Sequence, residues 1–195
     1  MAESTALERR QAVANIGERE GFPRIHGLNH HAFRCRNAEE TRHFYEDILK
    51  LPLVATVSHD RVPSTDQHHP YFHIFFELGD GSFLAFFDLL DERGHTPDPA
   101  TPDWVNHLAL DVATHEDLLS AKTALEAAGV SVLGPVDHKW FHSIYFFDPN
   151  GIRLELVHRT ASLAEMRAKA AAAHAILATR AQRIADLQGK AAAHG

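Results

Sequence analysis

The fold is decided by the stretch V-D-H-K-W-F-H-S-I-Y-F-F-D-P-N-G-I-R-L-E-L at residues 136–156. Two apolar, aromatic-rich runs flank the tetrapeptide D-P-N-G in this stretch. Proline presets the first turn residue, and Asn150 and Gly151 tolerate the tight or left-handed backbone that follows. We therefore predict that residues 143–147 and 152–156 pair as an antiparallel β-hairpin.

Three chemically useful side chains converge on this predicted hairpin. Tyr145 and Glu155 fall within about a residue of each other across the ladder, and His138 enters just upstream. A histidine, a phenol and a carboxylate gathered in this way indicate a functional site. Taken alone, each has a plainer explanation: Tyr145 could fill core with its hydroxyl at the rim, and Glu155 could be a surface residue of its strand.

The second half of the chain repeats the first half. The run V-N-H-L-A-L-D-V at 105–112 matches L-N-H-H-A-F-R-C at 28–35, and a predicted helix follows each run. The turn Gly79-Asp80-Gly81 of the first copy corresponds to D-P-N-G of the second. A duplicated β-α-β-β-β unit is the simplest interpretation. Because one copy is too small to close a core alone, we expect an α+β domain in which the two modules pair their sheets.

The segments outside this repeat are expected to be helical extensions and connections. Residues 3–20 show a polar helical pattern that ends near glycine and proline. Residues 162–190 are alanine-rich with a helical apolar stripe, typical of a helix packed on its own domain or on a dimer mate. The histidine- and proline-bearing segment 58–70 is expected to be a loop. The expected organisation is an N-terminal helical extension at 1–24, a domain at 25–160 with modules 25–90 and 104–160, and a C-terminal helix at 161–195.

Composition and charge exclude several classes of function. With 45% hydrophobic and 23% charged residues, the 195-residue chain is typical of a globular protein. Its net charge of −7 argues against nucleic acid or an anionic membrane as a partner. We expect neither a membrane span nor a secretory signal, because no apolar run is long enough and the N-terminus is polar. The single cysteine, Cys35, excludes an internal disulfide and suits the cytoplasm.

The repeat places two histidines at one position of two related modules. His30 and His107 stand at the same point of the matching runs, so both point into one cleft if the modules pair about a pseudo-twofold axis. With Glu155 they form a two-histidine, one-carboxylate set, which suits non-haem Fe(II) and leaves coordination positions open. The counterpart of Glu155 in the first module is Ala85, so a fourth protein ligand is not expected. A lone strand histidine is more often a packing residue, but two at matched positions favour a metal.

These residues resemble the vicinal oxygen chelate superfamily of glyoxalases, bleomycin-resistance proteins and dioxygenases. The resemblance covers about residues 26–159 and is carried by H-x-A-[FL] opening both modules, F-Y-E-D-I-L-K-L-P-L, and F-F-D-P-N-G-I-R-L-E-L. It implies the paired β-α-β-β-β fold. The run from His138 through Ile144-Tyr145 and Asp148-Pro149 to Glu155 is similar to the pattern of one-domain type I extradiol ring-cleaving dioxygenases. Glyoxalase-like relatives share the D-P-x-G…E part but not the H…I-Y part.

The resemblance implies Fe(II), with Mn(II) as the alternative, held by His30, His107 and Glu155. It also implies that His138 and Tyr145 line the substrate side and hydrogen-bond the oxygens of a catecholate.

The chain departs from the family pattern at Gly81-Ser82, where family members commonly carry an acid–base histidine. His73, on the preceding strand, is expected to substitute, with His68 and His69 as alternatives. A different substrate or a lost activity would also explain the departure.

The expected function is therefore that of an Fe(II)-dependent extradiol dioxygenase that cleaves a catechol-type aromatic with O2. A glyoxalase-type lyase or isomerase is one alternative, but such enzymes usually use four protein ligands. A drug-binding protein of the bleomycin-resistance type, which needs no metal, is another. The expected partners are a small aromatic diol, O2 and a second copy bound through the C-terminal helix. An apolar wall could be formed by Phe83, Phe86, Phe87, Trp140 and Phe141, with packing in the core as an equal alternative for the last two.

Overall fold

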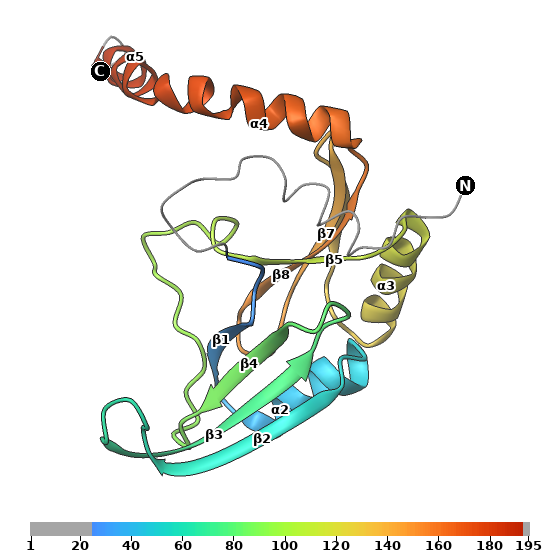
Figure 1. The fold of residues 1–195 in the computed structure, drawn as a ribbon, viewed down its shortest axis with the longest axis vertical. Helices are drawn as coiled ribbons and strands as arrows, with labels where there is room; N and C mark the ends of the chain where they lie inside the picture. The colour runs from blue at the N-terminus through green and yellow to red at the C-terminus, as the bar shows by residue number, and fades with distance from the viewer. Residues whose placement is uncertain (1–24, 193–195) are drawn as a thin grey trace. The chain divides into compact units, whose positions relative to one another are not determined.

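The computed structural model describes residues 25–192 and is shown in Figure 1. Contacts divide the chain into two units, one of residues 24–160 and one that contains residues 161–195. The predicted N-terminal helical extension at 1–24 lies outside the described residues.

Two four-stranded sheets of the same topology form the first unit, which confirms the predicted duplication. The strands of the first sheet are β1 (His30–Cys35), β2 (Leu53–Arg61), β3 (His68–Glu77) and β4 (Phe83–Asp88), in the order β1-β4-β3-β2. Those of the second are β5 (Leu108–Asp111), β6 (Leu133–Asp137), β7 (Phe141–Phe147) and β8 (Arg153–Arg159), in the order β5-β8-β7-β6. In each sheet the first and last strands pair in parallel and the other pairs are antiparallel.

One helical segment accompanies each sheet (Figure 1). In the first module, α2 (Ala38–Arg42) continues directly into the π-helix η1 (His43–Ile48), where the sequence predicts one uninterrupted helix. The Asn37 side chain caps α2, as predicted, by accepting two backbone N–H groups. In the second module, α3 (His115–Ala127) opens with a capping box between Thr114 and Asp117. Both helical segments pack on their own sheets, α2 on β4 and α3 on β7 and β8.

A single apolar core joins the two modules. Alternate residues of each strand face this core, so Phe76, Leu84 and Phe86 are fully buried while their neighbours face the other side of the sheet. The buried members are Cys35, Phe44, Tyr45, Ile74, Phe76, Leu84, Phe86, Leu118, Leu125, Ile144, Phe146, Ile152, Leu154 and Leu156. The opposite faces of the two sheets are thereby left for polar and aromatic side chains.

One predicted connection is shorter than expected. The segment 58–70 is a loop only at residues 62–67, because β2 extends to Arg61 and β3 begins at His68, and the two strands pair His59 with Tyr71 and Arg61 with His68. Register shifts between Leu53 and Ala55 and between His59 and Arg61 interrupt this ladder. In the second module, β6 starts at Leu133 and contains a proline. An edge strand tolerates proline, because one side of it carries no ladder hydrogen bonds.

The D-P-N-G turn is fastened to the helical segment of the other module. The Asp148 carboxylate accepts the backbone N–H groups of Asn150 and Ile152, at 2.9 and 2.8 Å, and the hydroxyl of buried Tyr45 at 3.1 Å. The Asn150 amide accepts the backbone N–H of Arg36 at 2.9 Å and donates to Thr41 Oγ1 at 3.2 Å. Burial raises the pKa of Asp148, and it also raises the pKa of Tyr45, where the charge of Asp148 adds to the effect. The turn therefore closes the hairpin and ties the second module to the first.

The second unit is helical, but the single predicted helix is divided at Thr179. It contains α4 (Leu163–Ala178), which opens with a capping box between Ser162 and Glu165, and α5 (Arg180–Ala192). Within residues 25–192, we find no helix with the length and apolar character needed to cross a bilayer.

We expect the Cys35 thiol to be unreactive in the native protein. Burial raises its pKa to about 11 and leaves 1% of its surface exposed. The thiolate fraction at pH 8 is then roughly 100-fold below that of an ordinary cysteine, and reagent access is lost as well. Labelling with a chromogenic disulfide reagent should proceed only after urea unfolding. Rapid labelling of the folded chain would contradict this burial.

Candidate metal centre

The centre of the candidate site is a histidine facing a buried carboxylate in the second module. His107 Nε2 lies 3.0 Å from Glu155 Oε2. Glu155 is 3% exposed and sits on β8, where it pairs with Ala109 on one side and Tyr145 on the other. His107 directly precedes β5, and a third of its side chain is exposed (33%), so the pair is reachable from solvent.

The hydrogen bonds around this pair call for a cation. His107 Nδ1 lies 3.2 Å from the carbonyl of Val105, which assigns the ring proton of a neutral imidazole to Nδ1. His107 Nε2 then presents a lone pair to the Glu155 carboxylate, which has no proton to donate. Two such acceptors at this distance are stable only with a proton or a metal ion between them. The donor set therefore fits a divalent metal.

Tyr145 and His138 extend the pair into a line of polar groups. The Tyr145 hydroxyl donates to Glu155 Oε1 at 3.1 Å and lies 2.8 Å from His138 Nε2. Since Tyr145 has one proton and gives it to Glu155, His138 is the donor in the second contact. Burial raises the pKa of Tyr145, and the nearby charge of Glu155 adds to this effect, so the phenol stays protonated at neutral pH. The convergence predicted from the hairpin is thus observed, in the predicted register of Tyr145 opposite Glu155.

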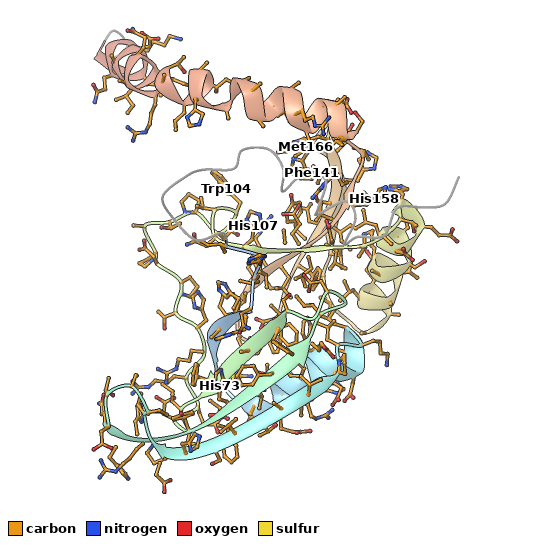
Figure 2. The ribbon with its side chains drawn as sticks, in the orientation of Figure 1. His73, Trp104, His107, Phe141, His158 and Met166 are labelled. Atoms are coloured by element: carbon orange, nitrogen blue, oxygen red, sulfur yellow. The ribbon has the colours of Figure 1, made fainter. Side chains whose placement is uncertain are left out.

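His30 and His73, the other two predicted site histidines, lie together in the first module. Their ring centroids are 6.5 Å apart, and His30 Nδ1 contacts Asn29 Oδ1 at 2.7 Å. Figure 2 shows His73 on the first sheet and His107 beside the second. Within residues 25–192, no three His, Cys, Asp or Glu side chains are grouped closely enough to hold one ion. The structure thus brings together two of the three predicted ligands, and the role of His30 stays a prediction.

His73 is held in an apolar environment. Its ring stacks on Phe87 with the centroids 3.6 Å apart, and its buried Nε2 has no hydrogen-bond partner within the described residues. Burial, together with the neighbouring His30, lowers the pKa of His73 to about 4. The imidazole is therefore neutral at pH 7, and its protonated form is disfavoured.

The strand register confirms that Ala85 is the counterpart of Glu155. In the first sheet Ala32 pairs with Ala85 and Phe75 with Ala85, while in the second Ala109 pairs with Glu155 and Tyr145 with Glu155. The first module thus has no carboxylate at this position, and Phe75 takes the place of Tyr145.

Sequence reasoning misplaced one aromatic residue and missed two residues of the site. Phe86 is fully buried in the core and cannot line a site, whereas Phe83 and Phe87 pair with His30 and His73. Phe75 was missed, although its T-shaped contact with His30 puts it on the same face. Arg153, whose guanidinium carbon lies 4.7 Å above the Tyr145 ring, was missed as well. The sequence signal for Arg153 was its predicted place in the hairpin, where it pairs with Phe147 of β7.

A paired-module α+β fold with a histidine–carboxylate pair on one sheet defines the class of protein. The family model described as the Glyoxalase/Bleomycin resistance protein/Dioxygenase superfamily matches residues 27–156. The chain belongs to this superfamily, as its resemblance to the vicinal oxygen chelate proteins predicted. No curated protein matches the sequence.

Solved structures share the fold at low sequence identity. An integron cassette protein from the mobile metagenome of the Halifax Harbour sewage outfall is 26% identical, with a TM-score of 0.50 over 69% of this chain and 99% of its own. A glyoxalase/dioxygenase from Nostoc punctiforme is 21% identical, with a TM-score of 0.54 over 74% and 100%. The fosfomycin resistance protein FosX from Listeria monocytogenes, in complex with Mn(II) and sulfate, is 18% identical, with a TM-score of 0.51 over 70% and 95%.

Proposed function

We propose that this chain is an Fe(II)-dependent extradiol dioxygenase that cleaves a catechol-type aromatic with O2. The observation that carries the proposal is the series of contacts from His138 through Tyr145 and Glu155 to His107. In it, His138 and Tyr145 are hydrogen-bond donors, and they lie beside a carboxylate and an imidazole that could bind a metal ion. The resemblance to extradiol enzymes rests on this same histidine and tyrosine.

His107 and Glu155 would hold the metal, with His30 as the third ligand. When bound, Fe(II) supplies positions for both diol oxygens and for O2, and it lowers the pKa of a bound phenol. β1 and β5 are the edge strands of their sheets. Approach of these two edges, within one chain or between two copies, would bring His30 to the pair. Mn(II) is the alternative ion, since oxygen and imidazole ligands suit both ions.

The remaining site residues would bind and orient substrate. Tyr145, kept protonated by its raised pKa, would give a hydrogen bond to a substrate oxygen, and His138 would hold the phenol in place by donating to its oxygen. His73, neutral at pH 7 and a weak base, would accept a hydrogen bond from a diol hydroxyl. The aromatic side chains of the first module would exclude water from that side of the site. In the net reaction, one molecule of O2 is added, and the ring bond next to the diol opens to a semialdehyde acid.

Oxygen uptake tests the proposal. Protein reconstituted anaerobically with Fe(II) is expected to consume O2 and form a yellow product with one or more members of a catechol panel. Tyr145→Phe, which keeps the ring but removes the proton, should lower the rate about 100-fold. Phe147→Tyr, a matched change at an exposed site of the same strand, should leave the rate unchanged.

Two other outcomes would replace the proposal. No oxygen uptake, with activity supported by Zn(II), Ni(II) or Mn(II), would indicate a lyase, isomerase or resistance enzyme. Ala85 counts against the glyoxalase-type lyase or isomerase, because four protein ligands are usual for that type. Ligand binding unaffected by His107→Ala would indicate a metal-free binding protein.

We also propose that the chain is cytoplasmic and forms homo-oligomers through residues 161–195. The free thiol of Cys35 supports the compartment. The helical stripe of Leu163, Met166 and Leu177 supports the assembly, because apolar residues at such spacing form helix–helix contacts.

A further inference from the structure

A second histidine cluster lies on the other face of the second sheet. His142 on β7 and His158 on β8 are directly opposite in the ladder, and His115 is the first residue of α3. Figure 2 shows His158 beside the N-terminus of α3. The shortest contact in the cluster joins His115 Nδ1 to His142 Nδ1, at 3.2 Å.

This cluster is separate from the candidate metal centre. Along β7, His142 shares the face of the core residue Ile144, whereas Tyr145 lies on the opposite face. Along β8, His158 and Glu155 are divided in the same way. The sheet therefore stands between the two groups. No residue of the proposed dioxygenase site takes part in the cluster.

We propose that His115 and His142 chelate a borderline divalent transition-metal ion such as Zn²⁺ between α3 and the second sheet. The proposal does not depend on the function assigned to His107 and Glu155. Two imidazoles would supply two ligands, and water would supply the rest, because no third side chain is within reach in the described residues.

The geometry of the nitrogen pair fits a shared ion. Two ligands of a tetrahedral Zn²⁺, each about 2.1 Å from the ion, lie about 3.4 Å apart, close to the 3.2 Å separation of His115 and His142. An N–H···N hydrogen bond would also satisfy this contact, so the pair is stable without an ion. Metal binding requires only that the shared proton leave, which neutral imidazoles allow.

The surroundings of the pair favour a cation. The other nitrogen of His142, Nε2, lies 3.7 Å from Asp137 Oδ1, a distance too long for a hydrogen bond, so this carboxylate contributes negative charge beside the ring. Glu116, in the first turn of α3, adds negative charge. His158 Nδ1 is buried with no hydrogen-bond partner within the described residues, and its ring centroid is 6.3 Å from that of His115, so it is a neighbour of the pair and not a third ligand. His115 is exposed, which leaves a path for the ion.

Zn²⁺ titration of the full chain tests the proposal. The background is the double variant His107→Gln/Glu155→Gln, in which the candidate dioxygenase centre is removed. Calorimetry on this metal-free background is expected to show Zn²⁺ binding that His142→Gln or His115→Gln weakens by more than tenfold. Asp137→Asn should weaken binding by less than these two variants do, because it removes one negative charge near the pair and no ligand. His174→Gln on α4 is the matched control and should have no effect.

Imidazole ¹H–¹⁵N spectra give a second readout that needs no further variant. Added Zn²⁺ should shift the Nδ1 resonances of His115 and His142 in the double-variant background. Absence of Zn²⁺ binding there, or binding unchanged by both His142→Gln and His115→Gln, would overturn the proposal. A failed dioxygenase assay would leave this result untouched, because the two sites are removed by different substitutions.

Discussion

Replacing Glu155 with glutamine is expected to lower the affinity of the chain for Fe(II) by about 100-fold or more and to abolish ring cleavage. Glu155 is the one carboxylate that faces His107 in the described structure, and its side chain is almost fully buried. Glutamine has the same shape but carries no charge and presents an N–H donor where the metal would bind. Anaerobic Fe(II) titration followed by oxygen-uptake assays would measure both effects.

The same substitution separates metal binding from folding. In the metal-free protein, the amide introduced by Glu155→Gln can donate to His107 Nε2, whereas the native carboxylate faces this nitrogen as a second acceptor. The free energy of unfolding of metal-free Glu155→Gln should therefore equal or exceed that of the wild type. Glu77→Gln on β3 is the matched control and should change neither property. Wild-type Fe(II) affinity in Glu155→Gln would remove the basis for the proposed centre.

The parts of the fold predicted correctly are those that local chemistry decides. The turn residues and the alternation around D-P-N-G specify the register that pairs Tyr145 with Glu155, because a slip of one residue would turn every side chain to the other face. The repeat also predicted which residues of the two modules correspond. The pairing of Ala85 with Ala32, which matches that of Glu155 with Ala109, confirms this alignment.

The failures have physical causes too. Residues 58–70 are mostly polar and carry two prolines, as loops do, yet backbone pairing between β2 and β3 overrides this weak local preference at both ends and leaves a turn at 62–67. The position of His30 relative to His107 depends on how two sheet edges approach, and no local pattern determines that. Arg153 and Phe75 join the site through strand neighbours distant in sequence.

The hydrogen bonds of the D-P-N-G turn were also beyond sequence reasoning. The pattern predicts a turn, but nothing near Tyr45 or Thr41 in the sequence indicates that their hydroxyls contact residues of the second module. Polar residues buried at such a contact between modules make it specific, because each unpaired donor would cost free energy. This contact leads to the largest stability effect that we expect.

Replacing Asp148 with alanine is expected to lower the free energy of unfolding by about 4 kcal/mol. The carboxylate accepts hydrogen bonds from the Tyr45 hydroxyl, from the backbone and side chain of Asn150, and from the backbone of Ile152. Alanine would leave these buried donors without a partner. Asp80→Ala, in the corresponding turn of the first module, removes a carboxylate that accepts hydrogen bonds from the backbone and hydroxyl of Ser82, and it should cost about 1 kcal/mol. Urea unfolding of both variants gives the comparison.

A double-mutant cycle separates the two contributions of Asp148 to stability, its hydrogen bonds within the turn and its hydrogen bond to Tyr45 of the other module. Tyr45→Phe removes only the hydroxyl that reaches Asp148 across the modules, and it should cost about 1–2 kcal/mol by itself. If the tie contributes to stability, the cost of combining Tyr45→Phe with Asp148→Ala should fall below the sum of the single costs by about 1 kcal/mol. Strict additivity would mean that Asp148 acts only within its own hairpin. The two modules would then be held together by their shared apolar core, and the geometry of the turn would serve the register of Tyr145 and Glu155 alone.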